Sequence, residues 1–222
     1  MNEVILKANS ISKSFGKVAI LKDISLAVKK GESLAITGPS GAGKTTLLNC
    51  LSSLENPTGG SIEYGSTPIH QLKGRALAKF RNDKIGFVFQ FHHLIPELNA
   101  LENILLPTWI QGKDKNREEA KALALMEELG IADKAKSKPA ELSGGEKQRV
   151  AVARSLINDP AILFADEPSG NLDSKNSENL QKVLFNLVKE RNLTLVLVTH
   201  DIHWADKCDR NLAIEDGCLL SN

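Results

Sequence analysis

The chain has 222 residues, of which 41% are hydrophobic, and its 28 basic residues nearly balance its 27 acidic ones. This length suits one large α/β domain with a substantial core. The net charge of only +1 gives no reason to expect a nucleic-acid partner. The three cysteines are an odd number without a C-x-x-C pair, which disfavours both a disulfide framework and a zinc site.

The sequence predicts no membrane segment. The opening stretch MNEVILKANS lacks a basic region followed by an apolar signal core, and no apolar run approaches the roughly 18 residues that span a bilayer. We therefore expect any role at a membrane to come through a partner.

The opening third of the chain is typical of strands. Short apolar or alternating runs bounded by turn residues cover 4–10, 18–28, 33–37 and 61–64, the last after a turn at 57–60. This pattern predicts a β-rich lobe leading into a glycine-rich loop, which is followed by a helix over 46–54.

That loop, GPSGAGKTT at Gly38–Thr46, matches G-x-x-x-x-G-K-[ST]. Its glycines let successive backbone N–H groups turn toward phosphates, and Lys44 adds a positive charge near the β and γ oxygens. Thr45 can place its hydroxyl on Mg²⁺. The buried strand before the loop and the helix after it supply the context that such a loop requires.

The rest of the chain alternates strands with helices. A strand at 84–89 ends at Gln90; residues 98–129 are mostly helical by apolar spacing, with breaks expected at Pro107 and Gly112. A helix that begins at the glycine pair Gly144–Gly145 continues through 150–157. It is followed by a strand at 161–165, a helix at 174–190 and a strand at 193–199. This alternation predicts a mostly parallel sheet covered on both faces, with an inserted helical subdomain.

Two of these strands end in residues suited to catalysis. The run AILFADE delivers Asp166 and Glu167 at a strand end, where ligands of open α/β sheets bind. Asp166 can bind Mg²⁺ and Glu167 can polarise an attacking water, although such a pair can also simply begin the turn at Pro168. His200, after the last of these strands, can contact the γ-phosphate; a lone strand-end histidine often has no such role.

The run LSGGEKQRV at Leu142–Val150 offers a second phosphate-binding surface. Ser143, Gly144 and Gly145 bring a hydroxyl and backbone donors to a helix N-terminus. With the phosphate loop, Gln90, AILFADE, SGNLD and His200 in this order, the chain resembles the nucleotide-binding subunits of ABC transporters from Val4 to Leu219.

The resemblance implies one ABC domain over 1–222, with a core and an antiparallel β lobe at 1–90 and 159–222 and a helical subdomain near 91–158. It implies head-to-tail pairing of two copies, each ATP lying between one phosphate loop and the other copy's signature. Phe15 would stack on adenine, unless it is a core residue. The implied site comprises the catalytic residues Glu167 and His200, the Mg²⁺ ligands Thr45, Gln90 and Asp166, and the ATP-binding residues Phe15, Gly38, Pro39, Ser40, Gly41, Ala42, Gly43, Lys44, Thr45, Thr46, Gln90, Ser143, Gly144, Gly145, Glu146 and Asp173.

Within that family, the segment QFHHLIPELNALEN at Gln90–Asn103 is similar to the LolD-type ATPases that power lipoprotein release. ADEPSGNLD fits the wider clade, which usually has threonine where this chain has Ser169, and which also holds MacB-type efflux and FtsE-type cell-division ATPases. A soluble ABC ATPase that does not serve transport is a further alternative.

The resemblance implies a peripheral place on the cytoplasmic face of the inner membrane. It also implies transmembrane permease subunits that meet the loop after Gln90. His92 and His93 suit that surface better than a metal site, because adjacent histidines on a loop point apart.

Overall fold

The computed structural model describes residues 3–220, and the chain divides into two compact units. The first unit comprises Met1–Arg81 and Val188–Asn222, and the second comprises Asn82–Leu187. The predicted division into a core and a helical subdomain at 91–158 stays a prediction.

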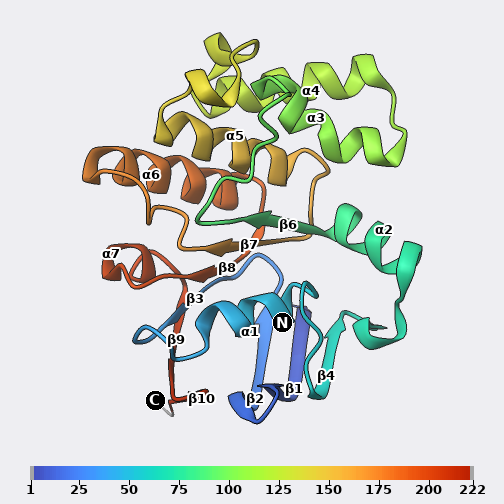
Figure 1. The fold of residues 1–222 in the computed structure, drawn as a ribbon, viewed down its shortest axis with the longest axis vertical. Coiled ribbons are helices and arrows are strands. Elements are labelled where there is room, and N and C mark those ends of the chain that lie inside the picture. The colour runs from blue at the N-terminus through green and yellow to red at the C-terminus, as the bar shows by residue number, and fades with distance from the viewer. Residues whose placement is uncertain (1–2, 221–222) are drawn as a thin grey trace. The chain divides into compact units, whose positions relative to one another are not determined.

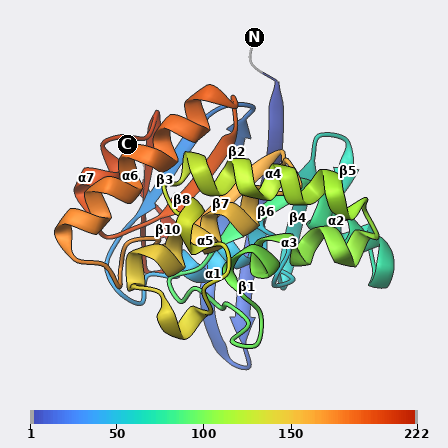
Figure 2. The ribbon, with the colours of Figure 1, turned by 90° about the horizontal axis from the view of Figure 1, so that it is seen from above.

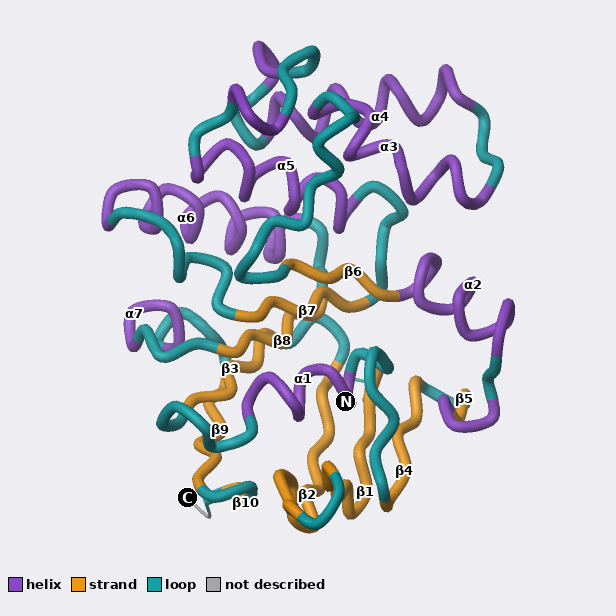
Figure 3. The backbone as a smooth tube through the Cα atoms, viewed as in Figure 1, coloured by secondary structure: helices purple, strands orange, loops and turns teal. Residues whose placement is uncertain are grey.

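The β lobe of the first unit is an antiparallel sheet in the strand order β2-β1-β4-β5. Its strands are β1 (Val4–Phe15), β2 (Val18–Lys29), β4 (Gly59–Tyr64) and the two-residue β5 (Thr67–Pro68), and Figure 3 shows β1, β2 and β4 lying side by side. Burial alternates along β1, where Leu6 and Ala8 face the core, as expected for a sheet with one solvated face.

A second set of strands in this unit runs in the order β10-β9-β3-β8. Strand β3 (Ser33–Thr37) is parallel to both β8 (Thr194–Val198) and β9 (Arg210–Glu215), while β10 (Cys218–Leu219) is antiparallel to β9. Every residue of β8 is buried, which is why this strand reads as a continuous apolar run. Helices α1 (Lys44–Leu51) and α7 (Ile202–Ala205) follow β3 and β8 in the chain.

In the second unit, β6 (Ile85–Val88) pairs in parallel with β7 (Ile162–Asp166). Helices α3 (Ala100–Gln111), α4 (Lys115–Glu128) and α5 (Gly144–Leu156) pack on one another, as Figure 2 shows. Helices α2 (Gly74–Lys84) and α6 (Ser174–Glu190), both labelled in Figure 1, each contain residues of both units. Single 3₁₀ turns lie at Ile69–Gln71, Ala132–Lys134 and Pro139–Glu141. No helix among residues 3–220 combines the length and the hydropathy that a membrane span needs.

The break expected at Pro107 is wrong, because this proline lies inside α3, which continues to Gln111. Proline costs the helix one backbone hydrogen bond, but buried Ile104 and Leu105 keep this stretch packed. The Asn82 side-chain amide also donates to the Pro107 carbonyl at 2.9 Å. The helix ends as expected at Gly112, which has a left-handed φ of 68°.

Candidate nucleotide-binding site

The phosphate loop after β3 depends on glycine for its shape. Gly38, Gly41 and Gly43 have φ values of 149°, 81° and 102°, which side-chain-bearing residues rarely adopt. A Cβ atom on Gly38 would lie 2.1 Å from the Ile214 carbonyl oxygen of β9. The backbone can therefore curl as a phosphate cradle requires only with glycine at these positions.

Helix α1 begins directly from this loop without a side-chain cap. Its N-cap residue is Gly43, which makes no side-chain hydrogen bond, whereas α3 and α5 start with capping residues Asn99 and Ser143. The unpaired N–H groups of a helix start, together with the helix dipole, attract anions. No side chain of the N-cap competes with a phosphate at this end of α1.

Lys44 lies over the same loop. Its ammonium group donates to the carbonyl oxygens of Gly38 at 2.8 Å and Pro39 at 2.9 Å. These two contacts fix the charge beside the curled backbone, where an incoming phosphate would meet it.

Phe15, the predicted adenine-stacking residue, ends β1 with 51% of its surface exposed. The alternative of a core residue is therefore wrong. Phe15 pairs with Val18 at the start of β2. The same strand passes close to the phosphate loop, because a Cβ atom on Gly43 would lie 3.1 Å from the Ile20 carbonyl oxygen. Phe15 thus offers an exposed ring on the part of the lobe that adjoins the loop.

His200 lies just beyond β8, at the strand end that adjoins the start of the phosphate loop. Strands β3 and β8 are parallel, with Ile36 opposite Val198, and the Thr199 N–H donates to the Ile36 carbonyl at 3.3 Å. His200 is exposed. The first unit therefore places His200 and the start of the phosphate loop at the same end of the β3–β8 strand pair.

In the second unit, β7 ends at Asp166, and Glu167 follows with a left-handed φ of 45°. Such a conformation is strained for a residue with a side chain and is often kept at functional sites. Gln90 lies close to Glu167, since both residues approach Gly170. A Cβ atom on Gly170 would lie 3.0 Å from the Gln90 amide nitrogen and 3.4 Å from the Glu167 carbonyl oxygen. The Asn171 side chain also donates to the Gln90 carbonyl at 2.9 Å.

The second glycine motif begins α5 as expected. Ser143 is the N-cap: its hydroxyl accepts from the Glu146 N–H at 3.3 Å, and the Glu146 carboxylate accepts from the Ser143 N–H at 2.7 Å. The hydrogen bonds from Ser143 lower the pKa of Glu146. Gly144 and Gly145 form the first turn, so their donors are those of a helix start.

Asp173 packs beside this helix start through its neighbour Asn176. Its carboxylate accepts from the Asn176 N–H at 2.9 Å and side-chain amide at 2.6 Å, and the backbone contact is the main cause of its lowered pKa. A Cβ atom on Gly145 would lie 3.1 Å from the Asn176 side-chain oxygen. The second unit therefore brings Gln90, Glu167, Asp173 and the start of α5 into one neighbourhood.

Two residues of α5 that the sequence analysis did not single out hold the chain on either side of Gln90. The Gln148 amide donates to the Phe89 carbonyl, and the Arg154 guanidinium donates to the carbonyls of His92 and His93. The available signal was a single arginine inside the apolar stretch VAVARSLI. A charge there requires polar partners.

A hollow of about 320 Å³ in the second unit lies beside this loop. Its wall includes Phe87 and Phe89, whose rings stack with centroids 4.1 Å apart, together with His93, Pro107 and Asn158. Within the described part of the chain, no carboxylate lines it.

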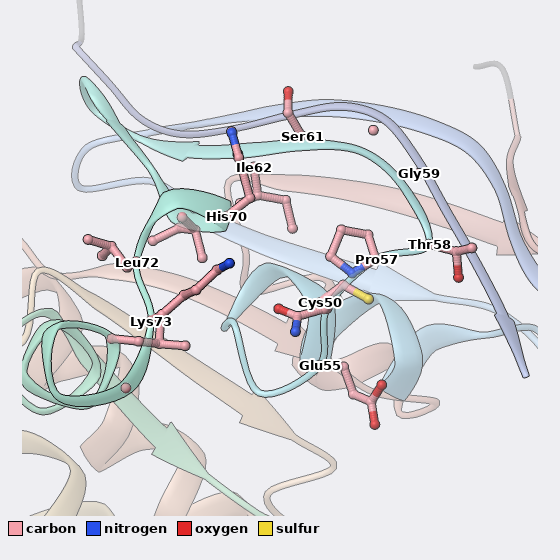
Figure 4. A pocket seen from close by; sticks show the side chains of 15 residues that line it. Cys50, Glu55, Pro57, Thr58, Gly59, Ser61, Ile62, His70, Leu72 and Lys73 are labelled. Carbon is pink, nitrogen blue, oxygen red and sulfur yellow. The ribbon is translucent and has the colours of Figure 1, made fainter.

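A separate hollow of about 410 Å³ in the first unit is lined by residues such as Cys50, Ile62 and Lys73 (Figure 4). None of the predicted site residues lines it. Burial raises the pKa of Cys50 to about 11, so this thiol is a packing group rather than a nucleophile. Over residues 3–220, no group of three or more His, Cys, Asp or Glu side chains is arranged to hold a metal ion.

Comparison with known proteins places this geometry in context. A family model described as ABC transporter matches residues 21–170. The chain is 47% identical over 218 residues to a Porphyromonas gingivalis protein called "Lipoprotein-releasing system ATP-binding protein LolD", covering 98% of this chain and 100% of that relative. A Cytophaga hutchinsonii protein of the same name is 48% identical over 216 residues, covering 97% and 99%.

Solved structures agree with these matches. The bacterial ABC transporter cassette MJ0796, solved as a dimer, is 39% identical, superposes with a TM-score of 0.90, and is matched over 98% of this chain and 97% of its own. A dimeric post-hydrolysis state of MJ0796 bound to ADP and Pi has the same TM-score at 38% identity and the same coverage.

Proposed function

The chain belongs to the ABC transporter family as an ATP-binding cassette, and we propose that it hydrolyses ATP to drive release of lipoproteins from a membrane. The observation that carries the ATP-binding part is the uncapped start of α1 inside a glycine loop, with Lys44 over it. The lipoprotein part is supported by relatives that bear that function in their names at 47% and 48% identity over nearly the whole chain.

We assign the binding of the triphosphate to the loop Gly38–Thr46. Backbone N–H groups of the loop and helix start would surround the phosphates, and Lys44 would leave its two backbone carbonyls for the β and γ oxygens. Phe15 supports the adenine with its exposed ring.

The proposed Mg²⁺ ligands are the Thr45 hydroxyl, the Gln90 amide oxygen and the Asp166 carboxylate. They fit the ion by their chemistry, since Mg²⁺ prefers oxygen donors and one or two carboxylates alongside phosphate. When bound, the ion neutralises charge on the triphosphate.

Hydrolysis is assigned to Glu167 and His200. Glu167 follows a buried strand in a strained conformation that fixes its direction, and its carboxylate would accept a proton from the attacking water. His200 would donate to the γ-phosphate and keep the water in place.

We propose that two copies of the chain act together, with the α5 start of each facing the nucleotide of the other. The helix start presents Ser143 and Gly144 at an exposed surface, whereas Gly145 is buried behind them, and the N–H groups of a helix start attract anions. The dimeric state of the MJ0796 cassette supports this arrangement. Because each copy carries both surfaces, the pairing is isologous.

The proposed membrane partners are permease subunits that meet the loop after Gln90, which would hold the chain peripherally at the inner membrane. Phe91 in this loop is 63% exposed, and the adjoining hollow has aromatic walls and no carboxylate among the described residues. A single exposed apolar residue is common on protein surfaces, so the support for a docking surface comes from the hollow with aromatic walls beside it.

The test is to purify the chain with its partners from detergent-solubilised membranes and measure ATP turnover with and without added lipoprotein. We expect a permease with a large domain outside the cytoplasm to copurify, and lipoprotein to stimulate turnover. Copurification of an efflux permease or a division protein, without stimulation by lipoprotein, would contradict the proposed cargo while leaving the ATP chemistry intact.

A further inference from the structure

A single arginine of α5 holds two consecutive carbonyls of the loop after Gln90. Arg154 donates from Nη1 to the His93 carbonyl and from Nη2 to the His92 carbonyl, both at 2.7 Å. The two nitrogens of a guanidinium form a planar, rigid fork, so the two contacts fix both position and orientation. This is a stronger constraint on the loop than two independent contacts would give.

The backbone of His93 is shaped for this contact. Successive carbonyls of extended chain point in opposite directions, but His93 has a left-handed φ of 45°, and this turn brings both oxygens to the same fork. Its ring also lies edge-on to Phe89, with centroids 5.1 Å apart. The strained conformation persists because the arginine and the aromatic contact hold it.

One further contact ties the same segment to α5. The Gln148 amide, in a side chain that is 1% exposed, donates to the Phe89 carbonyl at 3.3 Å. The segment Phe89–His93 is thus held to α5 at two points, Gln148 and Arg154.

The charge of Arg154 has no carboxylate partner in the described part of the chain, where its hydrogen bonds are to these two carbonyls. Burial lowers the pKa of Arg154, yet a guanidinium stays charged in proteins. A half-buried charge is stable only with polar partners, so the loop and the helix depend on each other for their arrangement.

We propose that Arg154, assisted by Gln148, is a positioning residue that makes the segment Phe89–His93 and helix α5 move as one body. The consequence rests on the proposed function: a push on the segment by a permease would move Ser143, at the other end of α5, relative to the nucleotide of the second copy. The arginine would then carry the coupling between membrane subunit and ATP site without touching either.

The contact itself can be tested on the full chain alone by limited chymotrypsin digestion. The exposed Phe91 lies within the held segment, while Phe15, 51% exposed, serves as an internal reference in the same molecule. We expect Arg154→Lys, which keeps the charge but loses the fork, to speed cleavage after Phe91 about tenfold relative to Phe15, as loss of one hydrogen bond to a charged group allows. Arg149→Lys is the matched control, because Arg149 also lies on α5 and donates to a carbonyl, that of Leu129. It should leave the ratio unchanged.

A second pair of variants separates the backbone shape from the side chain of His93. Asparagine adopts left-handed φ readily, whereas valine does not. His93→Asn should therefore keep the slow cleavage and His93→Val should lose it. Equal ratios in wild type and Arg154→Lys, or equal ratios in the two His93 variants, would overturn the inference.

The functional consequence is read as the stimulation factor, the ratio of ATP turnover with membrane subunits to turnover without them, at saturating ATP. We expect Arg154→Lys to lower this factor about tenfold while the KM for ATP changes less than about twofold, since the residue touches no nucleotide. Arg149→Lys should keep the full factor. Unchanged stimulation in Arg154→Lys would overturn the coupling role. Absence of stimulation in the wild type would instead count against the proposed function, and the digestion would still decide the contact.

Discussion

The Lys44 ammonium donates to the carbonyl of Gly38, six residues earlier, at 2.8 Å. The loop thereby holds its own cation over a backbone whose N–H groups are uncapped by any N-cap side chain. This arrangement is organised for a phosphate before any phosphate arrives, which lowers the ordering cost of binding.

Lys44→Ala should therefore weaken ATP binding by about ten- to a hundredfold, the range for losing a hydrogen bond to a charged group. The thermal midpoint should stay near that of the wild type, because within residues 3–220 the hydrogen bonds of the lysine are to carbonyls of its own loop. Titration with a fluorescent ATP analogue measures the affinity. Lys73→Ala, at an exposed lysine of the same unit, is the control for a lost surface charge. Equal effects of the two variants would remove Lys44 from the phosphate site.

Glu167→Gln should retain ATP and accumulate a dimer with two nucleotides. The amide keeps the size and hydrogen-bonding capacity of the side chain but cannot accept the proton of the attacking water, so turnover should fall by at least about a hundredfold. Turnover assays and size-exclusion chromatography with ATP measure both effects. Glu119→Gln, which removes an exposed carboxylate from α4, should behave like the wild type. Normal turnover in Glu167→Gln would reassign the catalytic base.

Ser143 permits a variant that separates helix stability from the ATP site. Ser143→Asp keeps an N-capping side chain and favours the helix dipole, yet it places a negative charge where the second copy's phosphate is proposed to bind. We expect it to unfold at or above the wild-type temperature while turnover falls more than about tenfold. Ser143→Ala, which loses the cap, should cost about 1 kcal/mol, or about 2–4 °C for a chain of this size, with a smaller loss of turnover. If turnover followed stability in both variants, Ser143 would act only through the helix.

The sequence was most informative where the physics is local. Strand β8 and helix α6 were predicted from the apolar pattern of their residues, and a helix start at Ser143–Gly145 from the glycine pair before the apolar stretch. Helix α2 was missed because none of its residues is buried, so no apolar stripe marks it. The break expected at Pro107 was wrong because the Asn82 contact and buried neighbours outweigh proline's local preference.

The candidate site divides in the same way. Lys44, Asp166 and Glu167 could be named from motifs, since phosphate and Mg²⁺ chemistry requires fixed residue types at fixed spacing. The role of Arg154 could not, because its partners lie 61 and 62 residues away and are backbone carbonyls, whose positions leave no pattern in the sequence.

His92 gives a pH dependence that distinguishes this loop from an ordinary surface loop. Burial, followed by the charge of Lys147, lowers the pKa of His92 below its ordinary value of 6.5; the neighbouring His93 and Arg154 act in the same direction, and the Gly144 backbone opposes them. The unfolded chain therefore binds this proton more readily than the folded one. The stabilising contribution of neutral His92 is complete above pH 6.5 and is lost as the pH falls toward the lowered folded value.

His92→Gln, which cannot titrate, should accordingly lose less stability than the wild type between about pH 8 and about pH 5. Urea unfolding of both proteins across this range measures the difference, in which the other titrating groups largely cancel. We expect the gap between the two unfolding free energies to shrink steadily below pH 6.5. A constant gap would mean that His92 titrates alike in the folded and unfolded chains, and burial of its ring would then not lower its pKa.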